Sequence, residues 1–221
     1  MKKFVLLGKS RTGSSLLINS LKQHPDMNVL SEIFNWRNDG IDKEIFDFDI
    51  EFNESNYKHT AKSHDLMCYK KYCKDAHKKY DGFKLLFCHL KNDVEEYLSE
   101  TDVFLLYRKN LLKRFVSQRV AFLTDQWFGG EPFTGTVYIR PDEVETDICQ
   151  VIQEYERLKQ FSSLNLFYEN SLFDNVNKTC DYLDIKRFTP KIYSKKRIDR
   201  PMSEVLHNYE ELKQYDHENY F

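Results

Sequence analysis

Two features of the sequence predict an α/β protein with a mostly parallel central sheet. The first is an apolar run, Phe4 to Leu7, that leads through a glycine- and serine-rich loop into leucines at helical spacing. The second is the alternation of apolar strands and amphipathic helical stretches along the rest of the chain. This order places helices on both faces of the sheet, so we expect a P-loop-like three-layer sandwich.

The predicted strands are short apolar runs bounded by polar or turn residues. The second strand follows the helix-breaking pair His24-Pro25 and ends near Glu32. The strands expected after the first are residues 28–31, 83–88, 103–107 and 164–168. Because helical segments separate these runs, the sheet is expected to be mostly parallel.

Two long helices are expected between the later strands. One covers residues 110–123, and the other covers residues 142–161 and carries an apolar stripe on one face. The stripe consists of Val144, Ile148, Val151, Tyr155 and Leu158. Near the end of the chain, Asn208 followed by Glu211 resembles a capping box for a short helix.

Length and composition favour one compact catalytic domain over residues 1–221. Hydrophobic residues make up 41% of the chain and aromatic residues 15%, which argues against disorder. A net charge of -2 gives no overall basic field, so we expect no nucleic-acid partner and only local anion sites.

The sequence carries no targeting, membrane or metal signal. The first apolar run is shorter than the ~7 to 15 residues of a signal peptide, and no segment reaches the ~20 apolar residues of a membrane span. The five cysteines contain no CxxC pair and the histidines have no metal-ligand spacing. We therefore expect a soluble, cytoplasmic protein with reduced thiols and no metal.

The loop at residues 8–15, Gly-Lys-Ser-Arg-Thr-Gly-Ser-Ser, departs from a nucleotide-binding P-loop at one position. A Walker A motif has a lysine there that reaches the β- and γ-phosphates of ATP or GTP, whereas this loop has Ser14. The loop can cradle one phosphate but is poorly equipped for a triphosphate. This argues against the alternative of an ATP-dependent small-molecule kinase.

Part of this loop, Arg11-Thr12-Gly13-Ser14-Ser15, resembles the 5′-phosphosulfate loop of PAPS-dependent sulfotransferases of the carbohydrate or tyrosylprotein type. PAPS, 3′-phosphoadenosine-5′-phosphosulfate, presents a single phosphate carrying a sulfonate, which suits a loop without the Walker lysine. The resemblance implies that these five residues bind the phosphosulfate. It also implies that the cation of Arg11 neutralises the leaving group.

The segment from Phe104 to Ser117 resembles the 3′-phosphate clamp of the same family. An apolar strand ends at Arg108, and Ser117 lies about two helical turns later; a guanidinium and a hydroxyl suit a dianionic phosphate. In many relatives the arginine directly precedes Asn or Asp, whereas Lys109 intervenes here. Lys109 therefore remains an alternative to Arg108.

Two later segments follow in the order of the family. Residues 166–170 resemble a strand end at which Tyr168 would meet the adenine. A basic stretch completes the implied cofactor-binding set with Lys195, Lys196 and Arg197. Together the four segments span nearly the whole chain.

Sulfuryl transfer to a hydroxyl requires a base, and Glu32 is the first candidate. If the first two strands are parallel neighbours, Glu32 and the loop both lie at carboxyl ends of the sheet, where open α/β sheets bind ligands. The spacing also resembles sulfotransferase branches in which a glutamate is the base. His64 and His89 are the alternatives, and Lys84, inside an apolar strand, would suit an anionic ligand.

The resemblance implies a PAPS-dependent sulfotransferase that acts on a hydroxyl, with a carbohydrate as the expected acceptor and PAP as product. A protein-tyrosine sulfotransferase and a noncatalytic nucleotide-binding protein stay open as alternatives. Residues 35–80 and 124–141 interrupt the order of elements, and we expect both to shape the acceptor site.

Overall fold

The computed structural model describes residues 2–34, 67–90, 92–127, 131–192 and 198–221. Its centre is a five-stranded sheet in the order β2-β3-β1-β4-β5, in which every neighbouring pair is parallel. The strands are β1 (Phe4–Gly8), β2 (Val29–Glu32), β3 (Gly82–Leu86), β4 (Asp102–Tyr107) and β5 (Ser162–Phe167). The predicted α/β class with a mostly parallel sheet is confirmed.

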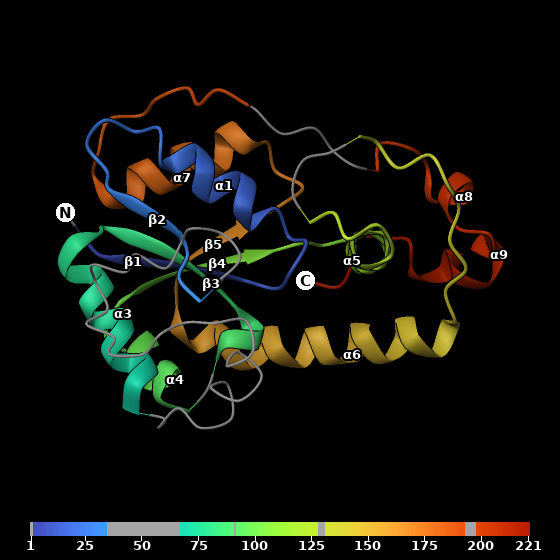
Figure 1. Cartoon of the computed structure of the whole chain (residues 1–221), viewed down its shortest axis with the longest axis horizontal. Coiled ribbons are helices and arrows are strands. Elements are labelled where there is room, and N and C mark those ends of the chain that lie inside the picture. The colour runs from blue at the N-terminus through green and yellow to red at the C-terminus, as the bar shows by residue number, and fades with distance from the viewer. Residues whose placement is uncertain (1, 35–66, 91, 128–130, 193–197) are drawn as a thin grey trace.

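Helices cover both faces of the sheet, as Figure 1 shows. One face carries α1 (Ser14–Leu21) and α7 (Leu172–Leu183), and the other carries α3 (Met67–Lys79), α4 (Asn92–Leu98) and α6 (Pro141–Leu158). The stripe predicted for α6 is buried along its whole length. Among the described helices, none has the length and apolarity that crossing a membrane requires.

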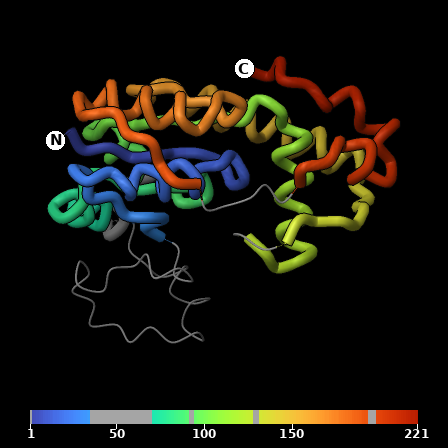
Figure 2. The backbone as a smooth tube through the Cα atoms, turned by 90° about the horizontal axis from the view of Figure 1, so that it is seen from above, coloured from blue at the N-terminus to red at the C-terminus, as the bar shows by residue number. Residues whose placement is uncertain are grey.

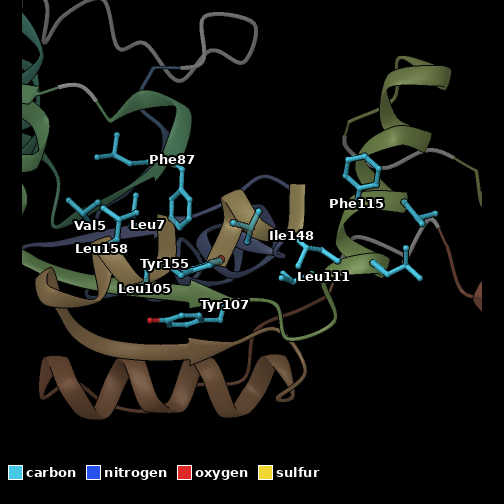
Figure 3. Packing of buried hydrophobic residues seen from close by; sticks show 14 of the residues in the cluster. Val5, Leu7, Phe87, Leu105, Tyr107, Leu111, Phe115, Ile148, Tyr155 and Leu158 are labelled. Carbon is cyan, nitrogen blue, oxygen red and sulfur yellow. The ribbon is translucent and has the colours of Figure 1, made fainter. Parts of the chain in front are cut away.

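The residues of β1 explain why helices pack on both faces of the sheet. Phe4 and Leu6 lie in one core with residues of α1 and α7, whereas Val5 and Leu7 lie in a larger core on the other face. Successive side chains of a strand point to opposite faces, so a strand that is apolar at every position must be covered twice. Figure 3 shows Val5 and Leu7 beside Tyr155 and Leu158 of α6.

The strand order corrects one expectation. The first two strands are not neighbours, because β3 lies between β1 and β2 and pairs with both. All strands still run in the same direction, so their carboxyl ends share one edge of the sheet. The last part of the region 35–80 forms α3, which contributes Cys73 and Ala76 to the larger core. Residues 35–66 lie outside the described part of the chain.

The described part of the chain contains three short 3-10 helices, and two of them replace the predicted ends of elements. The strand expected over 83–88 stops at Leu86, and the helix expected over 142–161 stops at Leu158. The 3-10 helices are η1 (Phe87–His89), η2 (Lys159–Phe161) and η3 (Lys213–Tyr215). The turn η1 therefore places His89 just beyond the carboxyl end of β3.

The C-terminal part of the chain packs beyond the carboxyl ends of the strands. Its short helices α8 (Met202–Val205) and α9 (Tyr209–Leu212) lie near α5 (Leu111–Thr124) and residues 131–140 (Figure 2). The expected capping box does not form, because no side chain caps α9. Asn208 instead binds the backbone of Ile139, with Nδ2 2.8 Å from the carbonyl and Oδ1 3.3 Å from the amide N.

Candidate active site

The loop between β1 and α1 has an unusual backbone conformation. Arg11 has φ 67° and Gly13 has φ 83°, both in the left-handed region that glycine adopts freely and arginine does not. Two hydrogen bonds hold the loop: Thr12 Oγ1 donates to the Lys9 carbonyl at 2.8 Å, and Arg108 Nη1 donates to the Arg11 carbonyl at 2.9 Å. The helix α1 begins directly afterwards, so the backbone N–H groups of its first turn favour an anion at this loop.

Tyr168 closes over the loop from the end of β5. A Cβ atom on Gly13 would lie 2.6 Å from Tyr168 Cδ2, so any side chain at that position would force the tyrosine ring or the loop to move. The guanidinium carbon of Arg108 lies 4.5 Å from the centroid of the Tyr168 ring. This cation–π contact brings together the loop and the ends of β4 and β5.

Arg11 reaches from the loop to α5. Its Nε donates to Ser117 Oγ at 3.0 Å, and its Nη1 donates to the Trp127 carbonyl at 2.6 Å. The structure therefore brings a residue of the predicted phosphosulfate loop into contact with one of the predicted 3′-phosphate clamp. The backbone carbonyl of Trp127 as a partner of Arg11 could not be predicted from the sequence, because no pattern of side chains indicates a backbone acceptor.

Arg108 has spare hydrogen-bonding capacity. Its Nε is buried and has no hydrogen-bond partner in the described part of the chain. Burial lowers the pKa of Arg108 from its ordinary value by desolvation, with smaller opposing effects from Tyr168 and Glu169. Buried N–H groups rarely lack a partner, and an anionic ligand would supply one. Lys109 is placed differently, because its ammonium lies 5.0 Å from the centroid of the Phe167 ring.

Glu32 lies at the carboxyl end of β2 in a buried ion pair. Its Oε2 is 2.7 Å from Lys84 Nζ, and the two residues are 6% and 3% exposed. Their positions in the sheet explain the contact, since Glu32 pairs with Lys84 in the register of β2 and β3. Lys84 also donates to Ser15 Oγ at 2.8 Å, which connects the candidate base to the first turn of α1.

His89 lies on the other side of Glu32, with Nε2 3.5 Å from Glu32 Oε1. Burial is the main cause that lowers the pKa of His89 to about 4; the carboxylate of Glu32 opposes this shift, and the nearby Lys84 adds to it. Nδ1 accepts a hydrogen bond from the Leu86 amide at 3.1 Å. A neutral imidazole with an accepting Nδ1 carries its proton on Nε2, facing Glu32. This arrangement favours Glu32 over His89 as the base.

Other predicted residues have different surroundings. Lys9, which the sequence leaves without a role, forms an ion pair with Glu154 of α6 at 2.7 Å. Thr12 and Ser14 are buried in the loop. The predicted residues that fall outside the described part of the chain are His64, Lys195, Lys196 and Arg197.

Comparison with known proteins supports the fold. No protein-family model matches the chain, and no curated protein matches its sequence. Among solved structures the chain is similar to the crystal structure of a sulfotransferase from Alicyclobacillus acidocaldarius, with a TM-score of 0.51 and 14% identity. The match covers 89% of this chain and 86% of that one. At this low identity the likeness is one of fold, so the chain has an α/β fold similar to that of a sulfotransferase.

Proposed function

We propose that this protein is a PAPS-dependent sulfotransferase that acts on an acceptor hydroxyl, with carbohydrates as the expected acceptor class. One observation carries the proposal: Arg108 stacks on Tyr168 and holds the backbone of the phosphate loop, while its buried Nε keeps an unused donor. A site for a nucleotide with a second phosphate needs such a cation beside the loop. The sulfotransferase-like fold supports the same function.

The residues at the loop fit PAPS. The backbone of residues 12–15 and the cation of Arg11 would hold the 5′-phosphosulfate, since no Walker lysine is present to favour a triphosphate. Arg108 and Ser117 would hold the 3′-phosphate, and Tyr168 would contact the adenine. When bound, PAPS supplies a sulfuryl group attached to a phosphate that departs as the leaving group.

The protein's own contribution to the reaction would be a base and a cation. Glu32 would accept the proton of the acceptor hydroxyl, and Lys84 holds one of its oxygens so that the carboxylate keeps one orientation. The guanidinium of Arg11 would offset the charge that grows on the departing phosphate. In the described structure Arg11 bonds to Ser117 and Trp127, so the same cation lies between the two predicted phosphate sites.

Calorimetry with adenosine 3′,5′-bisphosphate, 5′-AMP and ATP tests the cofactor. The bisphosphate should bind about 10- to 100-fold more tightly than 5′-AMP, because a charge-assisted contact to phosphate is worth about 1.5–3 kcal/mol. Equal affinities for the two nucleotides would contradict the proposal. Tight, magnesium-dependent ATP binding would instead indicate a kinase.

Transfer assays separate an enzyme from a binding protein. Purified protein is incubated with radiolabelled PAPS and a panel of carbohydrates and tyrosine-containing peptides. Transfer to a carbohydrate is the expected result. Transfer to tyrosine alone would indicate a protein-tyrosine sulfotransferase, and tight bisphosphate binding without any transfer would favour a noncatalytic nucleotide-binding protein.

A further inference from the structure

Glu169, the residue after Tyr168, binds the turn that carries Arg108. Its Oε2 accepts a hydrogen bond from the Lys109 amide at 3.0 Å, and its Oε1 accepts one from the Asn110 amide at 3.2 Å. Both oxygens of the carboxylate are therefore used by backbone N–H groups. These groups directly precede α5, whose N-cap is Asn110, so the negative charge also interacts favourably with the start of that helix.

The turn that these two bonds hold points its two cations in different directions. Arg108 extends over the Tyr168 ring and donates to the Arg11 carbonyl, whereas the ammonium of Lys109 lies over Phe167. A turn of another shape would exchange or displace these two cations. Because the carboxylate of Glu169 is occupied by the backbone, none of the hydrogen bonds of Arg108 in the described structure goes to it.

We propose that Glu169 is a positioning residue for the 3′-phosphate site: it holds the turn between β4 and α5 so that Arg108, and not Lys109, faces the phosphate loop. The inference rests on the proposed function, in which this site binds a nucleotide with a 3′-phosphate. Tyr168 and Glu169 are consecutive, so one strand end both contacts Arg108 and orients the turn that presents it.

The substitution Glu169→Gln tests this role. Glutamine keeps the size of the side chain but has a single acceptor oxygen, and its NH2 group would oppose one of the two amide N–H groups. The measured quantity is the ratio of dissociation constants for 5′-AMP and adenosine 3′,5′-bisphosphate. We expect this ratio to fall about tenfold in Glu169→Gln, while the affinity for 5′-AMP changes less than about threefold.

Ser171→Ala is the matched control. Ser171 caps α7 by accepting a hydrogen bond from the Asp174 amide at 3.0 Å, so its loss destabilises a helix start two residues further along the same segment. This variant should keep the wild-type ratio. A fall in the ratio for Ser171→Ala equal to that for Glu169→Gln would show a general loss of stability and would overturn the inference.

A double-mutant cycle with Arg108→Ala gives the sharpest outcome. If Glu169 acts through Arg108, Glu169→Gln has no further effect on the ratio once the guanidinium is gone. An undiminished effect in that background, or a wild-type ratio in Glu169→Gln itself, would overturn the inference and leave the proposed function standing. A wild-type protein that does not distinguish the two nucleotides contradicts the proposed function, and the inference falls with it.

A second variant covers the case in which Glu169→Gln does not fold. Glu169→Asp keeps the charge but shortens the side chain by one methylene, so the carboxylate can no longer reach both amide groups. We expect the ratio to fall at least about threefold in this variant. A ratio equal to that of the wild type would overturn the inference.

Discussion

Lys84 of β3 and Glu32 of β2 form a buried ion pair, with Nζ and Oε2 2.7 Å apart. The pair lies beside the loop between β1 and α1, because Lys84 also donates to Ser15 at the start of α1. A carboxylate proposed as a catalytic base is thus part of the packing between two strands and a helix. Its chemical and structural roles can be separated by mutation.

Lys84→Met should strongly destabilise the protein. Removing one partner leaves a buried charge without compensation, which typically costs about 3–5 kcal/mol. The double variant Glu32→Gln/Lys84→Met should lose clearly less stability than the summed losses of the two single variants, as measured by urea unfolding. Lys78→Met is the control, since Lys78 pairs with Asp75 on the exposed surface of α3. Additive losses at Glu32 and Lys84 would contradict the coupling.

Glu32→Gln should abolish most turnover while leaving nucleotide binding nearly unchanged. The amide keeps the size of the side chain but cannot accept the acceptor proton, and a positioned base contributes roughly 10² to 10⁴ in rate. Turnover at saturating donor and acceptor is compared with bisphosphate affinity from calorimetry. Near-normal turnover would transfer the role of base to His89 or His64.

Arg11→Ala and Arg11→Gly remove the same guanidinium but differ in backbone strain. Both should lower turnover more than they weaken bisphosphate binding, because the charge of the leaving group grows in the transition state. Arg108→Ala should show the reverse pattern. Since Arg11 has φ 67°, the glycine variant should be more stable than the alanine variant by about 1 kcal/mol in urea unfolding. Intact turnover in both Arg11 variants would contradict the assigned role.

Gly13→Ala should disrupt the contact between the loop and Tyr168. The new Cβ would lie 2.6 Å from Tyr168 Cδ2, on a backbone with φ 83° that alanine rarely adopts. We expect a loss of stability of about 1–3 kcal/mol and weaker bisphosphate binding. Adding Tyr168→Ala removes the steric clash but not the backbone strain, so the double variant should lose less stability than the two single losses combined. If the stability losses of the two single variants simply added, the clash would have to be relieved in another way.

Stability should fall as the pH is lowered from about 6.5 towards 4. Burial lowers the pKa of His89 to about 4, so as the pH falls the imidazole of His89 takes up a proton in the unfolded chain at a higher pH than in the folded chain. Stability therefore rises with pH in this interval. His77, whose pKa burial also lowers to about 4, acts in the same direction. Across this interval the unfolding free energy of His89→Gln should change with pH less than that of the wild type, by up to about 3 kcal/mol.

The elements and the loop could be predicted because their signals are local. The apolar run of β1, the stripe of α6 and the turn residues before α1 each depend on side chains close together in the chain. The absence of a lysine at Ser14 is equally local, and the prediction that the loop is poorly equipped for a triphosphate follows from it without reference to the rest of the fold.

Contacts between distant residues were settled only by packing. The position of β3 between β1 and β2, the pairing of Glu32 with Lys84 and the reach of Arg11 to Ser117 join residues far apart in sequence. At Asn208 a tertiary contact replaces a local one, because its side chain binds the backbone of Ile139 instead of capping its own helix. Local propensities are worth about 1 kcal/mol or less per residue, whereas burying a side chain or satisfying a buried polar group is worth as much or more. Where the two conflict, the tertiary contact prevails, and no pattern within a short segment reveals its partner.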